Sequence, residues 1–218
     1  MEKTAQRTLQ VIERVQRTSP DLLEIRFDLL KPNVSASMIR EATDLPMIAT
    51  NRRRDEGGLF SGTEKDRTYV LTRAAQEGFD YVDVELRTTG VRALVHQLHQ
   101  DGAKAIVSNH NTRTTPPLTV LERLLRRQKG IGADVCKIVT MAKRDLDNLP
   151  CLALVSKYAS TTKLVSFAMG EAGVLSRVMS PVLGAYFTYA SSRPGRETAA
   201  GQPSVNRVRA LYRKLGIA

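Results

Sequence analysis

The sequence predicts one α/β domain, a TIM-type (β/α)8 barrel that lacks its first strand or is truncated there. Short apolar runs of strand length alternate with amphipathic segments of helix length along the chain. No linker or shift in composition divides the 218 residues. Helices between strands imply parallel pairing with right-handed crossovers, and this many units in about 200 residues favour a barrel over an open sheet. We therefore expect residues 1–218 to form a single barrel domain.

The expected elements follow from the spacing of apolar residues and from helix start and stop signals. Strands are expected at residues 22–27, 46–50, 80–85, 103–108, 134–139, 163–167 and 181–186. Helices are expected at residues 2–18, 62–78, 90–101, 118–130, 144–159 and 172–180, among others. The chain opens on a helix, so the strands are one short of a closed barrel. We expect a gap before residues 22–27 or a start further upstream, with reduced stability or compensation by another segment or subunit.

The composition limits the classes of protein to which this chain can belong. With 42% hydrophobic and 25% charged residues, the chain resembles ordinary globular proteins. It contains no apolar run of about 18 residues, so no membrane span is expected. Its charged first residues lack the apolar core of a signal peptide, which predicts a cytoplasmic protein. Cys136 and Cys151 are too few for a disulfide framework or a four-cysteine zinc site, and we expect both to be reduced and buried.

The formal net charge of +11 permits nucleic-acid binding without indicating a motif for it. Aromatic residues make up 5% of the chain and tryptophan is absent, so base-stacking platforms are scarce. The arginines are dispersed along the chain, and a small anionic substrate explains part of the charge equally well. A basic nucleic-acid-binding domain stays as an alternative, and it predicts steeply salt-dependent binding.

Three expected strands carry charges where strands covered by helices should be continuously apolar. The charged positions are Glu24, Arg26 and Asp28 in the first, Asp83 and Glu85 in the second, and Lys137 in "DVCKIV". Outer helices would turn these side chains toward the barrel axis, and the carboxyl ends of barrel strands are where catalytic residues lie. A surface strand with solvated charges explains any one of them equally well. The two signs could compensate one another, as buried ionisable groups require.

The remaining candidates for functional residues are three histidines and one loop. His110 follows an apolar strand, a position suited to a general acid or base, although a lone loop histidine is more often structural. His96 and His99 suit a solvated helix face. Residues 191–205 are rich in small and turn-forming residues, which fits an ordinary connection or a lid.

Seven stretches, taken in order, resemble type I 3-dehydroquinate dehydratase, the Schiff-base enzyme of the shikimate pathway. They are "EIRFD", "ATNRRRDEGG", "DVELR", "SNHNT", "VCKIVTMA", "FAMGEAGVLSR" and "TAAGQPS". The resemblance covers residues 22 to 205, and its specificity lies in the ordered set rather than in any single string. Thr198 stands where the family usually has serine, "TAAGQ" lacks the usual proline, and "SNHNT" replaces the commoner aromatic–His–Asp pattern.

The resemblance implies a lyase that converts 3-dehydroquinate to 3-dehydroshikimate in aromatic amino acid biosynthesis. Lys137 would form an iminium with the substrate ketone, His110 would be the general acid and base, and Glu85 would hold and polarise His110. The implied substrate-binding residues are Glu24, Arg26, Arg52, Arg177, Thr198 and Gln202. The resemblance also implies no metal or organic cofactor, no nucleic-acid or membrane partner, and a cytoplasmic homodimer.

The chemistry explains why a strand lysine is needed. An iminium makes the adjacent C–H acidic because its nitrogen accepts the electrons. An ordinary lysine, with a pKa of about 10.4, is almost entirely protonated at neutral pH. We expect the apolar strand and the charges of Arg26, Arg52 and Arg177 to disfavour the ammonium form of Lys137. A class I aldolase or transaldolase shares such a lysine but usually acts on phosphorylated sugars, and it remains the second enzyme hypothesis.

Overall fold

The computed structural model describes residues 4–31, 34–192, 195 and 197–217. The chain divides into two compact units. Unit 1 comprises Met1–Val107 and Gly130–Asp134, and unit 2 comprises Ser108–Lys129 and Val135–Ala218. Residues 2 and 3 of the first expected helix lie outside the described residues, as do residues 193, 194 and 196 of the expected loop.

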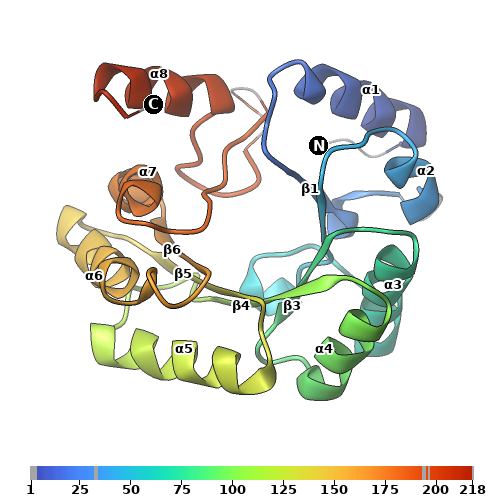
Figure 1. Cartoon of the computed structure of the whole chain (residues 1–218), viewed down its shortest axis with the longest axis horizontal. Helices are drawn as coiled ribbons and strands as arrows, with labels where there is room; N and C mark the ends of the chain where they lie inside the picture. The colour runs from blue at the N-terminus through green and yellow to red at the C-terminus, as the bar shows by residue number, and fades with distance from the viewer. Residues whose placement is uncertain (1–3, 32–33, 193–194, 196, 218) are drawn as a thin grey trace. The chain divides into compact units, whose positions relative to one another are not determined.

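Parallel strands and helices alternate through both units (Figure 1). The strands are β1 (Leu23–Arg26), β2 (Met47–Thr50), β3 (Tyr81–Glu85), β4 (Lys104–His110), β5 (Val135–Met141) and β6 (Leu164–Met169). The α-helices are α1 (Ala5–Gln16), α2 (Ala36–Arg40), α3 (Glu64–Gln76), α4 (Val91–Gln100), α5 (Leu118–Ile131), α6 (Leu149–Tyr158), α7 (Val174–Val182) and α8 (Val205–Lys214). Short 3-10 helices are η1 (Phe27–Leu29), η2 (Arg54–Glu56), η3 (Asp145–Asn148) and η4 (Glu171–Gly173).

In unit 1, β1, β2 and β3 are parallel hydrogen-bonded neighbours in that order. The register places Arg26 beside Thr50 and Thr50 beside Asp83, so the carboxyl ends of the three strands lie level. Burial alternates along β1: the apolar Leu23 and Ile25 are buried, whereas the polar residues between them are partly exposed. This alternation agrees with Glu24 and Arg26 sharing one face of β1.

In unit 2, β5 and β6 are parallel, with Lys137 beside Val165. Both strands are almost entirely buried, as expected for strands covered by helices. The last three residues of β4, which end at His110, also belong to this unit. Helices α5, α6 and α7 flank the strands of unit 2 (Figure 1).

The expected strand at residues 181–186 is wrong. Pro181 and Val182 continue helix α7, and Gly184, with a φ of 97°, turns the chain beyond its end. The following segment forms no strand: Tyr186 donates its N–H to the Leu164 carbonyl (2.8 Å), and Ser191 makes an isolated parallel bridge to Ser204. The described residues therefore contain six strands where the sequence predicted seven. They are two strands short of a closed eight-stranded barrel rather than one.

Two predictions from composition can be compared with the structure. Among the described residues, no helix combines the length and apolar character needed to cross a membrane. Cys136 and Cys151 are both buried and unbridged, as predicted. Burial raises the pKa of the Cys136 thiol to about 12, so the reactive thiolate form is suppressed.

Candidate active site

A buried ion-pair cluster occupies the carboxyl ends of β2 and β3 in unit 1. The Arg52 guanidinium donates to Asp83 (2.7 Å) and to Glu85 (2.9 Å), and both carboxylates are completely buried. Burial alone would lower the pKa of Arg52, but the charges of Asp83 and Glu85 outweigh it and raise the pKa well above its usual value. Arg52 therefore keeps its charge, and it compensates Asp83 and Glu85, although it was not among the charges of the strand pattern.

Glu85 is held by more than one donor. Its Oε1 also accepts the Arg53 backbone N–H (3.2 Å), and its Oε2 accepts from Arg67 (2.6 Å). Arg67 comes from helix α3 and is almost fully buried. The carboxylate of Glu85 is thus fixed in position by Arg52 and Arg53 from the segment after β2 and by Arg67 from helix α3.

Asp28 organises the residues beside this cluster. Arg26 donates to both Asp28 oxygens (2.8 and 2.7 Å), and the N–H groups of Arg52 and Leu59 donate to the same carboxylate. Although burial would raise the pKa of Asp28, the bidentate bond from Arg26 lowers it. Glu24 accepts the Thr50 hydroxyl (2.9 Å). These contacts fix the guanidinium of Arg26 and the start of the segment that carries Arg52.

Glycine is required in the loop after Arg52 because of close backbone approach. A Cβ atom on Gly58 would lie 2.0 Å from the Arg52 carbonyl oxygen. Only glycine therefore lets the segment fold back against Arg52, and this accounts for part of the "ATNRRRDEGG" string.

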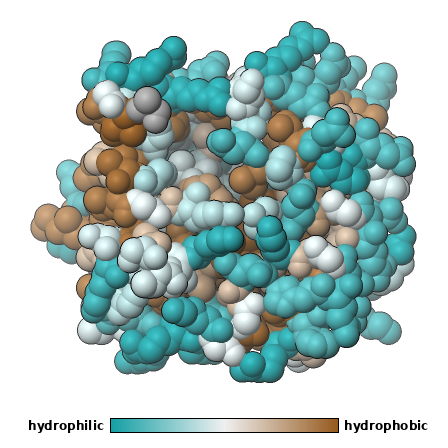
Figure 2. Space-filling model, in the orientation of Figure 1, coloured by the Kyte–Doolittle hydropathy of each residue, from teal (hydrophilic) through white to brown (hydrophobic). Residues whose placement is uncertain are grey.

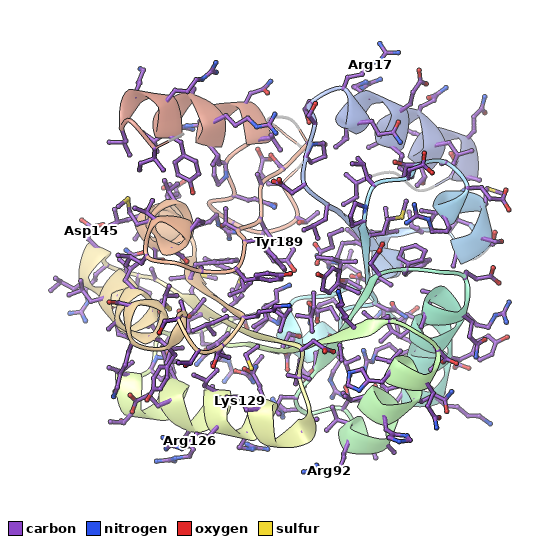
Figure 3. The ribbon with its side chains drawn as sticks, in the orientation of Figure 1. Arg17, Arg92, Arg126, Lys129, Asp145 and Tyr189 are labelled. Carbon is purple, nitrogen blue, oxygen red and sulfur yellow. The ribbon has the colours of Figure 1, made fainter. Side chains whose placement is uncertain are left out.

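In unit 2, Lys137 lies in the middle of β5 and is only 4% exposed. Its backbone carbonyl accepts the Gln128 side chain (2.9 Å), which ties the strand to helix α5. Its Nζ lies 4.0 Å from the centroid of the Tyr189 ring. Tyr189 points into unit 2, whereas Arg126 and Asp145 project outward from it (Figure 3). Lys137 is therefore a buried amine resting on an aromatic face.

Tyr189 is itself packed among aromatic rings. Its ring centroid lies 5.4 Å from that of Phe187, edge to face, and 6.3 Å from that of Phe167. Such pairs stabilise one ring orientation. The surface beneath Lys137 is therefore well defined.

Arg177 is the second buried cation of unit 2. Its guanidinium carbon lies 4.1 Å from the Phe167 ring centroid, and the residue is 2% exposed. The neighbouring Ser176 fixes its helix: the Ser176 hydroxyl accepts the Ala168 N–H (2.9 Å), and its own N–H donates to Asn148 (2.9 Å). The start of α7 is thereby tied to the end of β6, which explains the "GVLSR" string.

Thr198 and Gln202 form a local pair. The backbone N–H and the hydroxyl of Thr198 both donate to the Gln202 Oε1 (2.9 and 3.1 Å). With its carbonyl end so occupied, Gln202 presents its NH2 end as the donor. Gly201 lets this segment approach Gly170, because a Cβ at Gly201 would lie 2.1 Å from the Gly170 carbonyl oxygen.

His110 is the last residue of β4 and is partly exposed. The next residue fixes the exit of the chain: the Asn111 N–H donates to Val139 (2.9 Å), and its side-chain oxygen accepts the N–H groups of Arg113 and Thr114. The string "SNHNT" differs from the usual family pattern, but its Asn111 side chain still shapes the turn. Of the helix histidines, His99 lies 2.7 Å from Asp134, and His96 is exposed.

The predicted site residues are distributed over both units. Unit 1 contains Glu24, Arg26, Arg52 and Glu85, of which Arg52 and Glu85 are in direct contact. Unit 2 contains His110, Lys137, Arg177, Thr198 and Gln202, of which the last two are in contact. Within the described part of the chain, no three metal-binding side chains cluster.

Three residues that contact predicted site residues were not singled out as site residues from the sequence. Asp83 was noted only as a strand charge, although it shares Arg52 with Glu85. Arg67 carried no signal, because an arginine three residues after Glu64 on a helix suggests a surface pair. Tyr189 lies just beyond the segment that was misassigned as a strand.

Comparisons with known proteins agree with these features. The family model described as "Type I 3-dehydroquinase" matches residues 1–218. A protein of Methanothermobacter thermautotrophicus named 3-dehydroquinate dehydratase is 37% identical over 98% of this chain and 94% of its own. One of the same name from Dehalococcoides mccartyi (strain CBDB1) is 36% identical over 89% of this chain and 86% of its own.

Solved structures give the same result. The 3-dehydroquinate dehydratase of Geobacillus kaustophilus HTA426 matches with a TM-score of 0.91 at 25% identity, over 99% of this chain and 88% of that chain. The enzyme from Enterococcus faecalis matches with a TM-score of 0.84, also at 25% identity, over 97% of this chain and 90% of that chain. These likenesses confirm the predicted fold class.

Proposed function

Because the chain belongs to the type I 3-dehydroquinase family, we propose that it dehydrates 3-dehydroquinate through a Schiff base on Lys137. Membership and the named relatives make the chain a lyase, a 3-dehydroquinate dehydratase. The observation that carries the proposed mechanism is the environment of Lys137: a single amine in an apolar strand, 4% exposed, with its Nζ on an aromatic face. Burial in this strand keeps the amine away from bulk water.

In the proposed reaction, the neutral Nζ attacks the ketone carbon and water leaves, forming a C=N bond that carries a positive charge. Loss of the adjacent proton sends its electron pair into the iminium nitrogen, which gives a neutral enamine. The enamine then expels the β-hydroxyl as water when a proton reaches the leaving oxygen. Hydrolysis of the resulting iminium releases the enone product and frees Lys137.

We assign the proton transfers to His110. It would accept the α-proton and return it to the departing hydroxyl, so one imidazole serves both steps. Glu85 would orient the imidazole and stabilise its charged form. The buried carboxylate of Glu85 is anchored by Arg52 and Arg67, which fixes its position in unit 1.

The remaining predicted residues are proposed to bind the substrate. Arg177 and the NH2 end of Gln202 suit its carboxylate, because both donate N–H groups to oxygen. Thr198 supports Gln202 through the bonds described above, a contact that a serine would also make. We propose that Glu24, Arg26 and Arg52 bind the hydroxyl groups of the substrate or shape the site. The proposed reaction needs no metal or organic cofactor.

We further propose that both units act as one catalytic domain, and that the chain works in the cytoplasm as a homodimer in aromatic amino acid biosynthesis. Helix α7 supports the dimer: its one charged residue, Arg177, is buried, and its outer residues include the exposed Leu175 and Val182. Hydrophobic surface gathers over α6 and α7 (Figure 2). Large exposed apolar patches mark interaction sites, and we assign this one to a second copy. Sedimentation equilibrium tests the assignment against the 24.1 kDa chain.

Turnover tests the activity directly. The purified chain, mixed with 3-dehydroquinate, should produce the ultraviolet absorbance of a conjugated enone without added metal or cofactor. The class I aldolase hypothesis instead predicts cleavage of a phosphorylated sugar and no enone. A chain that forms no enone from 3-dehydroquinate would refute the proposed function.

A further inference from the structure

We propose that Phe167 is a positioning residue of unit 2, which fixes the guanidinium of Arg177 relative to the amine of Lys137. The consequence is a preference for γ-keto acids, whose ketone and carboxylate are separated as they are in 3-dehydroquinate. This inference rests on the proposed function, which assigns Lys137 to the ketone and Arg177 to the carboxylate. It adds the residue that sets the spacing between those two groups.

The register of β5 and β6 places Phe167 on the same face as Lys137. Lys137 lies beside Val165, and Val139 lies beside Phe167. Because side chains two residues apart on a strand share a face, Phe167 and Lys137 belong to one face of these two strands. Phe167 is 2% exposed, so its ring is enclosed by neighbouring side chains.

The Phe167 ring belongs to a series of contacts that runs from one cation to the other. The Arg177 guanidinium carbon lies 4.1 Å from the Phe167 ring centroid. The Tyr189 centroid lies 6.3 Å from that of Phe167, and the Lys137 Nζ lies 4.0 Å from the Tyr189 centroid. A cation is attracted to the face of an aromatic ring. Two adjoining rings therefore connect the guanidinium to the amine.

Hydrogen bonds fix the chain segment that carries Tyr189. The Thr188 hydroxyl donates to the Arg177 carbonyl (2.9 Å), and Thr188 directly precedes Tyr189. The Tyr186 N–H donates to the Leu164 carbonyl (2.8 Å), which ties the same segment to β6. Arg177 is thus held at both ends, by the bond to its carbonyl and by the aromatic face under its guanidinium.

A fixed separation between amine and guanidinium selects substrates by length. The amine must reach the ketone carbon while the guanidinium binds the carboxylate. Levulinate is a γ-keto acid and places these groups as 3-dehydroquinate does, whereas 5-oxohexanoate has one more carbon between them. A carboxylate out of reach leaves donors of the arginine unpaired, and reacting groups held in the wrong geometry react slowly. The site should therefore prefer levulinate.

Borohydride trapping measures this preference in the full chain. Each acid forms an iminium with the amine of Lys137 and releases water. Hydride then adds to the iminium carbon and leaves a stable secondary amine, which intact mass and peptide mapping detect. Both acids are methyl ketones, so their intrinsic reactivity is alike, and the ratio of the trapping rates of levulinate and 5-oxohexanoate reports the spacing. We expect a ratio of about 10 or more for wild type.

The central comparison is between two buried phenylalanines. Phe167→Leu removes the ring under Arg177, and we expect the ratio to fall by roughly 3- to 30-fold while the label stays on Lys137. Phe79→Leu is the matched control, because Phe79 is 1% exposed, packs against the ring of Phe27 and lies in unit 1. It should lose a similar amount of stability in urea and keep the wild-type ratio.

Two further variants separate positioning from a general loss of packing. Arg177→Met removes the group that binds the carboxylate, so adding Phe167→Leu to it should change the ratio by less than about 2-fold. Thr188→Val keeps the side-chain shape and removes the bond to the Arg177 carbonyl, so it should lower the ratio by less than Phe167→Leu does. If Phe167→Leu does not fold, Thr188→Val takes its place in the test.

The inference would be overturned by a folded Phe167→Leu with the wild-type ratio, or by an equal fall of the ratio in Phe79→Leu. It would also fail if wild type had no preference for levulinate, or if Phe167→Leu acted as strongly in the Arg177→Met background. Where the leucine variant is unfolded, an unchanged ratio in Thr188→Val would contradict it. Failure of the proposed function is distinguishable, because the wild-type chain would then form no enone from 3-dehydroquinate.

Discussion

Buried cations lie in both units, and their neighbours can be compared. In unit 1, Arg52 and Arg67 bind carboxylates at hydrogen-bond distance. In unit 2, Lys137 and Arg177 lie on aromatic faces, 4.0 and 4.1 Å from the ring centroids. An ion pair holds both partners through charge and hydrogen bonds, whereas the face of an aromatic ring attracts a cation more weakly. The ion pairs of unit 1 therefore form a fixed electrostatic framework, and the aromatic rings of unit 2 give Lys137 and Arg177 a defined packing surface.

The largest expected effect removes the amine from unit 2. Lys137→Met should reduce turnover by about 10^4-fold or more, because the covalent route is lost. Methionine has a similar length and suits an apolar strand, so the fold should be retained. Binding rests on other residues, and isothermal titration should still detect the substrate. If Lys137→Met formed the enone at nearly the wild-type rate, Lys137 would be a buried cation without a catalytic role, like the buried cations of unit 1.

The next effect concerns the framework of unit 1. Arg52→Met would leave two buried carboxylates with one cation fewer, which should lower the free energy of unfolding by about 3–5 kcal/mol. Arg17→Met is the control, because Arg17 pairs with Glu13 at the surface and its side chain is 76% exposed. Figure 3 shows Arg17 on the outside of the molecule. Its loss should change stability by about 1 kcal/mol or less.

Urea unfolding measures both variants. Equal losses of stability for Arg52→Met and Arg17→Met would mean that the buried cluster is no more important to the fold than a surface pair, and the description of unit 1 as a framework would be wrong.

A smaller effect tests the aromatic face in unit 2. Tyr189→Leu removes the ring below Lys137, and a cation–π contact is worth about 0.5–2 kcal/mol, so kcat/KM should fall by roughly 2- to 30-fold. Tyr189→Phe keeps the ring and should behave like wild type. Steady-state rates of enone formation measure the difference. If both variants lost activity equally, the hydroxyl rather than the ring would be the important part of Tyr189.

The smallest effect comes from an ion pair of unit 2 that lies at the surface. The bond from Lys157 (2.7 Å), followed by that from the Tyr158 hydroxyl, lowers the pKa of Glu122. A lowered folded pKa means that the stabilisation is present above the unfolded value, about 4.3, and is lost as pH falls below it. Wild type and Glu122→Gln should therefore differ slightly at pH 7 and converge in acid. Thermal melts across pH measure this, and a difference that grew toward low pH would contradict it.

The sequence predicted those parts of the molecule that depend on local periodicity. Apolar runs bounded by turns gave the positions of β1 to β6, and alternation along "EIRFD" predicted which face carries Glu24 and Arg26. The prediction failed at residues 181–186 because the apolar run "VMSPVLGAY" has no polar spacing, so helix and strand look alike there. The expected helix ended at residue 180, whereas α7 continues through Pro181 to Val182.

Lys137 and Glu85 were chosen from the sequence because a charge interrupts an apolar strand there; both are buried in strands, and their roles stay predictions. Contacts that join segments distant in sequence were not predictable. Arg67 contacts Glu85 across 18 residues, and Tyr189 contacts Lys137 from a segment without regular structure. Neither residue interrupts a pattern, so only the folded chain identifies it.

The central claim is that Lys137 forms a covalent bond with the substrate. Borohydride reduction in the presence of 3-dehydroquinate, followed by intact mass measurement and peptide mapping, tests it most directly. The account predicts one added substrate-derived mass per chain, located on the peptide that contains Lys137, and none in Lys137→Met. An unchanged mass, or a label on another residue, would contradict it.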